Sequence, residues 1–409
     1  MSETTPTGTR ARFFSGQEMF LLVSLFIGHT LMHCFQQGWY VLLPQIKTTF
    51  GLNAVQYGAI ESTKSISAGV ATLPAAVIGD LLRKRWSLVI CMALAGLGLA
   101  YLVLSVAPNY GVVLVGAGLV GIGAAAWHPP ALSVLSSRLA KRRGLALSVH
   151  GMGGNLGNAV GPLGLGVLVG VIGWQPASMV LAFPVVFGAT VLWLALRDVP
   201  GREGSGVEAS QYVTALRELV KNRVLVGLMI STGIRQMSST SIFAFFPVYC
   251  QEDLGFSSAK LGLFVSLLMA SGVASQPFLG ILSDRFGRKA VLVPSLFVLG
   301  VLEILLLWAG AGAGLVLVVV CIGLFIYSIG AVIQAAAMDS TAERTGAMTI
   351  GFLFVGSFVF AAPSPTIAGA LASAYGTPSV FLYSGALVLL STVIIMFLPI
   401  RRAVRPHGE

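Results

Sequence analysis

Charged residues are scarce in this sequence. They make up 10% of the 409 residues, whereas a soluble domain carries about 25%. Hydrophobic residues make up 56%, and the mean hydropathy is +0.88. Segments of about ten residues with alternating polarity, which build membrane β-barrels, are absent as well. The composition therefore excludes a soluble globular protein and indicates a helical membrane protein.

Cysteine is also rare, with four residues that lie in or beside apolar segments: Cys34, Cys91, Cys250 and Cys321. No pair has the spacing of a metal site or a disulfide, and we interpret the four as small packing residues. No nucleophile–base set or metal-binding motif stands out either. We therefore expect no enzyme activity, no catalytic residue, no cofactor and no metal ligand. Residues 1–17 are polar, so we expect no cleavable signal peptide.

Apolar runs of roughly 20 residues, the length that spans a bilayer, follow one another almost without gaps. Their number predicts an all-α polytopic membrane protein with twelve transmembrane helices. The runs cover residues 18–43, 54–79, 86–106, 110–137, 144–171, 176–196, 224–250, 258–282, 290–309, 314–338, 346–371 and 378–399.

The distribution of basic residues argues against a nucleic-acid partner despite the net charge of +10. Of the 25 Lys and Arg residues, 21 fall at the termini or in alternate loops, and the opposite loops hold only Lys47 and Lys260. Because cytoplasmic loops of membrane proteins are enriched in Lys and Arg, both termini are predicted to be cytoplasmic. We expect a multi-pass protein of the bacterial inner (plasma) membrane, acting as a monomer.

A weak internal repeat divides the chain. The stretch from Phe50 to Asp80 recurs from Leu254 to Asp284, at an offset of 204 residues, about half the length. Two similar apolar halves are typical of transporters that rock one half against the other. The repeat pairs Gly51 with Gly255, Gly58 with Gly262, Ser62 with Ser266, Ser67 with Ser271 and Asp80 with Asp284.

The repeat and the apolar runs predict three parts. Residues 1–196 form a first six-helix bundle, residues 224–409 form a second with a short basic tail, and the polar segment 197–223 links them on the cytoplasmic side. The part 208–221 of this segment could instead be an amphipathic helix on the membrane surface. A plain linker is the expectation.

The charges inside the predicted helices are the best pointers to a site. An unpaired charge in the bilayer core costs roughly 3 kcal/mol or more, so such residues need a reason to be there. Glu61 and Lys64 share one face of the second helix and replace Val265 and Leu268 of the repeat. Arg235 lies near the middle of the seventh helix. Glu303 lies in the ninth helix, which is expected to face outward, and we assign it no role.

Three interpretations of these charges remain open. Glu61 could pair with Lys64 or Arg235 as a structural ion pair. Alternatively, Glu61 could carry the coupling proton while Lys64 and Arg235 bind an anionic substrate, since Arg binds carboxylate or phosphate with two parallel hydrogen bonds. Glu61 could also bind a cationic substrate. We expect the second arrangement.

Histidines add a second group of polar residues. His29 and His33 are four residues apart and share a helical face, and His128 lies near the middle of the fourth helix. Three roles are open for these histidines: proton relay or substrate binding, packing through hydrogen bonds, and metal binding. We expect proton relay or substrate binding, with His33 in proton coupling. The predicted substrate-binding residues are Lys64, Arg235, His29, Gln36, His128, Asn155, Gln236 and Tyr327.

The loop from Gly280 to Lys289 resembles the cytoplasmic signature G-x-x-x-D-R-x-G-R-K of the major facilitator superfamily, and the first half holds a shortened version between Gly79 and Arg85. An Asp at a helix end beside several Arg can form a charge-assisted latch to a neighbouring helix. A solvated loop that only fixes topology is the alternative. The resemblance implies a latch of Asp80, Arg83, Asp284, Arg285, Arg288 and Lys289.

The fifth predicted helix resembles the superfamily's antiporter motif G-x-x-x-G-P-x-x-G-G, with Leu165 in place of one glycine. Its glycines and proline are predicted to pack and kink the helix: Gly157, Gly161, Pro162 and Gly166. The run from His128-Pro129-Pro130 to Gly161-Pro162 is similar to the fosmidomycin-resistance branch, which implies proton-driven export of small drugs. Pro130 departs from the acidic residue usual in that branch.

The sequence thus predicts a proton-coupled secondary transporter of a small organic anion or amphiphilic drug, exporting it by alternating access. Proton-coupled uptake or exchange of carboxylate or phosphate-ester anions is the alternative within transport. The alternative that does not involve transport is a membrane receptor or sensor, which would bind its ligand in the cavity that a transporter uses for its substrate. The expected partners are the small-molecule substrate, protons and membrane lipid.

Overall fold

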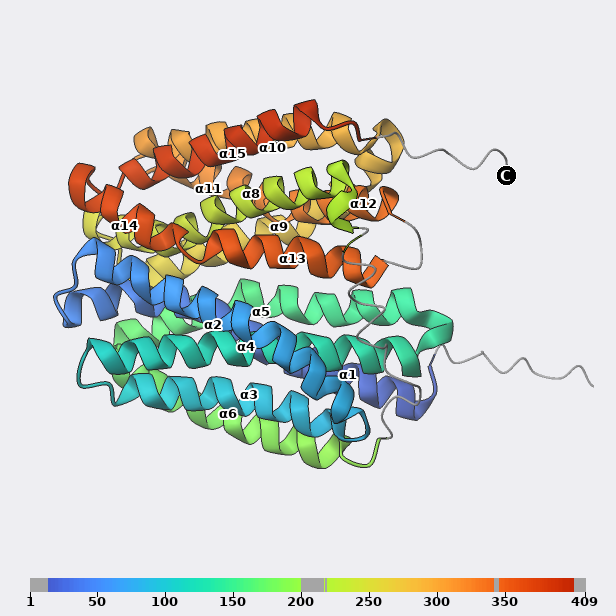
Figure 1. Cartoon of the computed structure of the whole chain (residues 1–409). Coiled ribbons are helices and arrows are strands. Elements are labelled where there is room, and N and C mark those ends of the chain that lie inside the picture. Colours follow the sequence, from blue (N-terminus) through green and yellow to red (C-terminus); the bar gives the residue numbers. More distant parts are fainter. Residues whose placement is uncertain (1–13, 200–216, 218, 342–345, 401–409) are drawn as a thin grey trace, which may run out of the picture.

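The structure is a computed structural model that describes residues 14–199, 217, 219–341 and 346–400. The described residues form helices and their connections (Figure 1). The first half contains α1 (Gly16–Thr49), α2 (Ala54–Leu81), α3 (Trp86–Ser105), α4 (Tyr110–Arg138), α5 (Arg143–Ile172) and α6 (Trp174–Leu196). The second half contains α8 (Arg223–Val248), α9 (Ser258–Phe286), α10 (Arg288–Leu305), α11 (Ala313–Ile326), α12 (Ser328–Asp339), α13 (Gly346–Ala361), α14 (Ser364–Tyr375) and α15 (Ser379–Phe397).

Local sequence sets the helix ends. Ser15 with Glu18, and Asn53 with Gln56, form capping boxes at the starts of α1 and α2, so backbone donors at these termini are satisfied. Gly287 separates α9 from α10 with a φ of 99°, a conformation that favours glycine. This is the second glycine of the loop signature, so the motif supplies a tight turn.

The two halves form separate layers (Figure 1). In the first half α1 packs against α5, α2 against α4, and α3 against both α4 and α6. In the second half α8 packs against α13 and α15, α9 against α11, and α10 against α15. The halves meet chiefly where α5 crosses α9 and where α2 crosses α14. The predicted all-α fold of two six-helix halves is confirmed.

The predicted twelve crossings correspond to these helices. Ten segments are long and apolar enough to cross a membrane, counting α11 with α12 and α13 with α14 as single segments. Among the long helices that the structure describes, α2 (28 residues) and α8 (26 residues) do not pass this test. These two helices carry Glu61, Lys64 and Arg235. The least apolar crossings are therefore those that hold the candidate site.

Two predicted helices are broken, contrary to the continuous runs 314–338 and 346–371. Between α13 and α14, Pro363 lacks the backbone N–H that would continue the helix. Between α11 and α12 the carbonyl oxygens beside Tyr327 are engaged by side chains. Ser275 donates to Leu324 O at 2.5 Å, and Arg235 donates to Ile326 O at 3.2 Å. Side chains that enter the carbonyl ladder in this way interrupt a helix.

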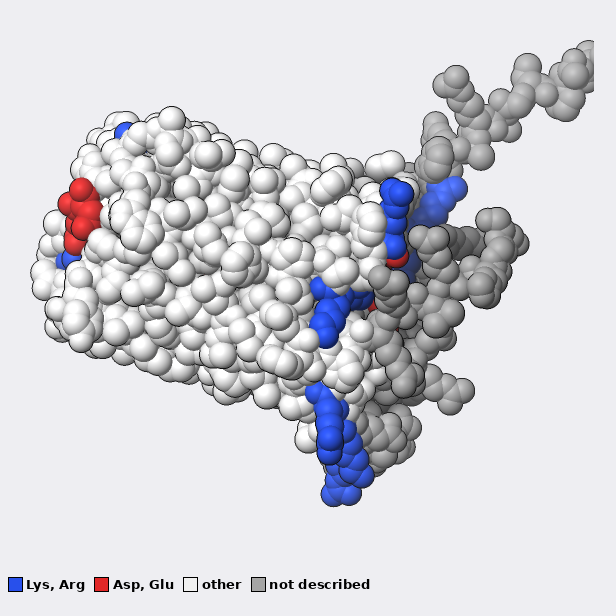
Figure 2. Space-filling view, turned by 90° about the horizontal axis from the view of Figure 1, so that it is seen from above, with Lys and Arg blue, Asp and Glu red and all other residues white. Residues whose placement is uncertain are grey.

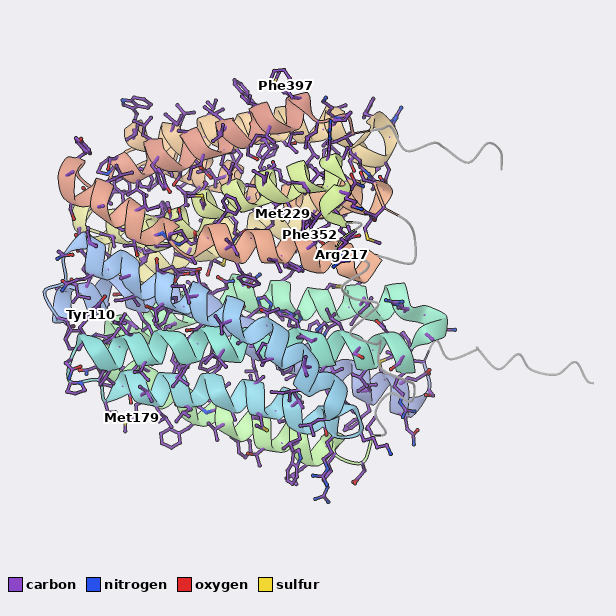
Figure 3. All side chains as sticks on the ribbon, viewed as in Figure 1. Tyr110, Met179, Arg217, Met229, Phe352 and Phe397 are labelled. Atoms are coloured by element: carbon purple, nitrogen blue, oxygen red, sulfur yellow. The ribbon has the colours of Figure 1, made fainter. Side chains whose placement is uncertain are left out.

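A wide belt without charged residues separates two charged ends in Figure 2. Many large hydrophobic side chains are exposed on the described surface, and we call this uncharged zone the apolar belt. Met179 and Phe397 lie on the outside of the bundle, where they are 45% and 81% exposed (Figure 3). Tyr110 lies at one end of the molecule and Arg217 at the other (Figure 3). We call the end with Arg217, Arg138 and Arg288 the basic end. The belt matches the hydrocarbon core of a bilayer and identifies an integral multi-pass membrane protein.

The crossings between the halves repeat each other. A Cβ atom added to Gly58 of α2 would strike Pro365 O of α14, and one added to Gly262 of α9 would strike Pro162 O of α5. Because Gly58 and Gly262 are paired by the sequence repeat, the interface has the pseudo-two-fold symmetry of that repeat. The lack of a side chain at both glycines lets the backbones approach closely.

The predicted packing motif of α5 serves two interfaces. Gly157 and Gly161 face the backbone of α1 at Thr30 and Cys34, within the first half. Gly166 faces the other half, where its Cβ would lie 2.5 Å from Ser258 O of α9. One helix therefore ties its own bundle together and also forms the crossing with the second bundle.

Candidate functional site

Glu61 and Lys64 form a buried ion pair on α2. Lys64 Nζ lies 2.7 Å from Glu61 Oε1. Glu61 is 1% exposed and Lys64 is 7% exposed. Trp39 Nε1 donates to Glu61 Oε2 at 2.9 Å, and Tyr40 OH donates to Oε1 at 3.3 Å. The carboxylate thus has partners on both oxygens, which a buried charge requires.

Aromatic rings from both halves surround the pair. The ammonium of Lys64 lies 4.4 Å from the centroid of the Tyr40 ring, a distance suited to cation–π attraction. Tyr40 stacks on Phe243 of α8 with a centroid distance of 5.4 Å, and Phe243 contacts Tyr327 at 6.3 Å. The ion pair of the first half is therefore connected through Tyr40 to an aromatic contact with the second half.

Arg235 lies in a separate environment on α8 and is 7% exposed. One terminal nitrogen donates to Ile326 O at the break between α11 and α12, while its Nε has no partner among the described residues. Arg235 also lines a cavity of about 200 Å³. Other residues that line this cavity are Ser65, Gln236, Gln334, Leu353 and Phe358.

Glu303 is buried and does not face outward, contrary to the sequence-based expectation. Its exposed fraction is 0%, Ser238 Oγ donates to Glu303 Oε2 at 2.7 Å, and Oε1 has no partner among the described residues. Its carboxyl group also interacts electrostatically with Arg235. The expectation failed because α10, the ninth predicted helix, buries one face inside the second half, where it packs chiefly against α15. Leu296 and Leu299 of this helix are buried as well.

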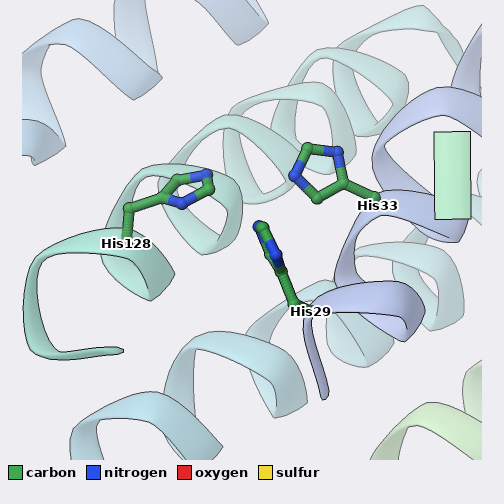
Figure 4. A group of neighbouring side chains, drawn as sticks. All are labelled: His29, His33 and His128. Atoms are coloured by element: carbon green, nitrogen blue, oxygen red, sulfur yellow. The ribbon is translucent and has the colours of Figure 1, made fainter. Parts of the chain in front are cut away.

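The histidines are brought together by α1, α4 and α5. The ring centroids of His29 and His33 lie 4.6 Å apart, those of His29 and His128 5.3 Å, and those of His33 and His128 5.9 Å (Figure 4). His150 stacks on His29 with a centroid distance of 4.0 Å. The spacing of His29 and His33 predicted that these two residues share a helical face. The contribution of α5 to the cluster could be seen only in the tertiary structure.

The predicted polar residues divide between three places. Gln236 lines the cavity with Arg235, and Tyr327 lies in the aromatic contact with Phe243. Gln36 has a buried Oε1 without a partner among the described residues. Asn158, three residues after the predicted Asn155, is the α5 amide that contacts a histidine, His33.

The loop signature forms contacts within the second half. Arg288 pairs with Asp284 and also with Asp339 at the end of α12, where Nε and Oδ2 are 2.9 Å apart. Lys289 donates to Leu398 O beyond α15 at 2.9 Å. Arg285 stacks on Phe286 instead. The signature thus fastens the α9–α10 turn to α12, while the side chains of Asp80 and Arg83 lie outside the described residues.

Polar contacts close the halves at the end opposite the basic end. Lys47 Nζ lies 2.5 Å from Glu252 Oε1, and Gln45 Nε2 donates to Gln251 Oε1 at 2.9 Å. Deeper in the interface, Tyr57 OH donates to Ala244 O at 2.5 Å. The sequence identified Lys47 only as a loop charge, since nothing in the spacing pairs it with Glu252.

We expect the Lys47–Glu252 pair to contribute modestly. Its side chains are 18% and 39% exposed, and pairs in contact with water are worth about 0–1 kcal/mol. In a double-mutant cycle of Lys47→Ala and Glu252→Ala, measured by thermal unfolding in detergent, the coupling energy should be about 0.2–1 kcal/mol and should fall in high salt. A larger, salt-independent value would contradict the assignment of this pair as a solvent-screened contact.

The fold and these sites define a class of protein. Two six-helix halves that meet around buried charges and a small cavity form a secondary membrane transporter and not an enzyme. The sequence profile of the Major Facilitator Superfamily matches residues 25–272 and residues 228–409. The chain belongs to the Major Facilitator Superfamily, as the loop signature predicts.

Individual relatives agree with this assignment. The chain is 27% identical to the fosmidomycin resistance protein of Escherichia coli (strain K12) over 406 residues, which cover 96% of this chain and 95% of the relative. It is 24% identical to a probable hexose phosphate transport protein of Chlamydia trachomatis over 429 residues, covering 96% and 93%. The crystal structure of a bacterial homologue of the human lysosomal transporter Spinster, inward-facing and occupied, shares the fold with a TM-score of 0.84 at 16% identity, covering 96% of this chain and 100% of that one.

Proposed function

We propose that this protein exports a small organic anion or amphiphilic drug in exchange for protons. The observation that carries the proposal is Arg235, a buried guanidinium that lines a cavity while its Nε has no partner. Buried donors are nearly always paired, so a vacant one beside a cavity points to a ligand. An anionic group bound there would accept hydrogen bonds from the guanidinium.

The surroundings of this cavity suit an amphiphile. A second, largely apolar groove of about 430 Å³ lies between α2 and α13. It shares Ser65, Phe354 and Phe358 with the cavity of Arg235, so the two spaces adjoin. Val70 and Val359 in this groove are 70% and 65% exposed at the apolar belt. The anionic group of a substrate would bind Arg235 while its apolar part occupies the groove.

Glu61 is the proposed proton carrier. As a carboxylate it neutralises Lys64; once protonated, it leaves the ammonium of Lys64 without a counter-ion and thereby favours an anion in the adjoining cavity. Ser65, the residue after Lys64, already lines that cavity. We place the basic end on the cytoplasmic side of a bacterial inner membrane, so the contacts at Lys47 close the outer side.

The relatives support this proposal and its alternative. Fosmidomycin carries a phosphonate and hexose phosphates carry a phosphate ester, so both names refer to small anions. Uptake or exchange of phosphate esters is therefore the second candidate, favoured by the same unpaired Nε of Arg235. Export and uptake differ in the direction in which the substrate moves relative to the protons. Transport measured under a proton gradient of known sign distinguishes them.

The test is transport by purified protein in proteoliposomes, with fosmidomycin and glucose 6-phosphate as probes. Arg235→Ala should weaken the apparent affinity for the transported probe about 10- to 100-fold, because hydrogen bonds to a charged group are worth about 1.5–3 kcal/mol. Arg235→Lys keeps the positive charge but lacks the planar guanidinium, so its apparent affinity for the probe should fall less than that of Arg235→Ala. Lys260→Ala removes a cation outside the cavity and should leave the affinity unchanged.

Glu61→Gln tests the coupling. This variant should still exchange substrate across the membrane but should no longer use a proton gradient to concentrate it. Proton-driven accumulation that persists in Glu61→Gln would contradict the assignment of Glu61 and move the coupling to another titratable group. Saturable binding of a probe without any exchange in the unmodified protein would identify a receptor instead of a transporter.

A further inference from the structure

The proposed transport cycle leaves the histidine cluster unused. His29, His33 and His128 each offer a ring nitrogen, and these three atoms all lie within 4.8 Å of one another (Figure 4). The rings come from two helices, α1 and α4, and face one common space (Figure 4). We propose that these three residues bind a divalent transition-metal cation such as Zn²⁺, which replaces the substrate and proton roles expected from the sequence.

The hydrogen bonds of two rings fix the nitrogen that is free to bind. His29 Nδ1 lies 2.7 Å from His150 O, and a carbonyl oxygen only accepts, so Nδ1 carries the proton and Nε2 has a lone pair. His33 Nδ1 lies 2.7 Å from Asn158 Oδ1, which gives the same tautomer when the amide oxygen faces the ring. In the neutral form of both rings the lone pair is therefore on Nε2, where it can bind a cation.

This pattern is the one in which metal-binding histidines are held. Such a residue donates its other ring N–H to a carbonyl or carboxylate, which sets the tautomer and orients the ring. His29 is 6% exposed, and its Nε2 has no partner among the described residues. A buried lone pair without a donor is unfavourable, and a bound cation would satisfy the free nitrogen of His29.

The separation of the nitrogens suits a small cation after a modest adjustment. With metal–nitrogen bonds of about 2.0–2.1 Å in a tetrahedral site, the nitrogens stand about 3.4 Å apart. Rotation about the side-chain torsions can bring nitrogens within 4.8 Å to that spacing. Three imidazoles with an open fourth position favour Zn²⁺, Ni²⁺ or Cu²⁺ over Mg²⁺ or Ca²⁺, which prefer oxygen ligands.

The third helix of the cluster makes room for the rings. A Cβ atom added to Gly154 of α5 would lie 2.7 Å from His29 Cε1 and 2.9 Å from His33 Cδ2. The glycine thus permits both rings to lie beside α5, where Asn158 orients His33. His33 and His128 are partly exposed, so both residues border space that solvent can reach.

The experiment uses the full chain purified with a tag that contains no histidine. Titration with Zn²⁺ at pH 7.5, followed by calorimetry, should show saturable binding of one ion per chain. His33→Ala and His128→Ala should each abolish it, and Co²⁺ should give the absorption spectrum of a tetrahedral nitrogen site only in the unmodified protein. Cys34→Ser, beside His33 but outside the triad, should bind as the unmodified protein does.

Asn158→Leu separates a positioning role from mere packing. Loss of an orienting partner costs 10- to 100-fold in metal affinity, so Zn²⁺ should still bind but about 10-fold or more weakly. Melting temperatures without metal check that each variant folds, and Gly154→Ala provides a second test in which every ligand is kept but two rings are displaced. The proposal is overturned if the unmodified protein shows no saturable binding, or if His33→Ala and His128→Ala bind Zn²⁺ as tightly as the unmodified protein does, whatever the transport assays show.

Discussion

Replacing Glu61 by valine is expected to lower the free energy of unfolding by about 3–5 kcal/mol, the usual cost of removing one partner of a buried ion pair. The reason is that Lys64, 7% exposed, would keep one hydrogen-bond acceptor, Tyr40 OH at 3.2 Å from its Nζ, and the cation–π contact with the same ring, but no counter-ion among the described residues. Thermal or denaturant unfolding of the purified protein in one fixed detergent measures the change.

The control for this prediction comes from the protein's own second half. The double variant Glu61→Val with Lys64→Leu installs the residues found at the repeat-equivalent positions Val265 and Leu268. Replacing a buried pair by apolar residues is often neutral or stabilising by about 1–4 kcal/mol, so stability should return. If the pair is only structural, the double variant will also transport; if it couples protons to substrate, the variant will fold but will not accumulate substrate.

Gly166→Ala and Gly164→Ala, two residues apart on α5, are expected to change stability in opposite directions. The new methyl group at Gly166 would lie 2.5 Å from Ser258 O and 3.0 Å from Gly262 Cα, so the halves must separate. Overpacking of this kind costs about 1–3 kcal/mol. At Gly164 nothing lies within 4 Å, and alanine should stabilise the helix by up to about 1 kcal/mol.

Melting temperatures of the two variants, measured side by side, test this pair, and substrate exchange in proteoliposomes shows whether the crossing is needed for transport. Gly58→Ala provides a replicate at the symmetry-related crossing, where the methyl group would meet Pro365 O. Equal melting temperatures for Gly166→Ala and Gly164→Ala would contradict this prediction. They would show that α5 and α9 can move apart at little cost in stability, so that their crossing does not require a glycine at position 166.

Much of the fold could be predicted from the sequence because its signals are local. Apolar runs located the crossings, and the repeat identified two halves related by symmetry. The interruptions at Tyr327 and at Pro363 were missed for different reasons. Pro363 is a helix-breaking residue, but it lies within a long apolar run that was interpreted as one continuous helix. The break at Tyr327 depends on Ser275 and Arg235, which lie far away in the sequence.

The candidate site was predicted less completely. The i, i+3 spacing placed Glu61 and Lys64 on one face, and a direct ion pair was among the open interpretations. Joint binding of an anion by Lys64 and Arg235 stays a prediction, since the cavity is lined by Arg235 and Ser65 while Glu61 contacts Trp39 and Tyr40. Glu303 was assigned no role because its helix was expected to face outward. Its contact with Ser238 joins two helices, which no local pattern could reveal.

The sequence by itself determined that this protein is a helical membrane protein of two related halves, because hydrophobicity and periodicity act on residues close together in the chain. The tertiary structure decided which polar groups meet: Lys47 with Glu252, His29 with His33 and His128, and Arg235 with the broken helix. Those contacts join residues on different helices, and the approach of the helices depends on glycines whose partners are backbone atoms of another segment. No local pattern encodes such a partner, so only the packed bundle reveals it.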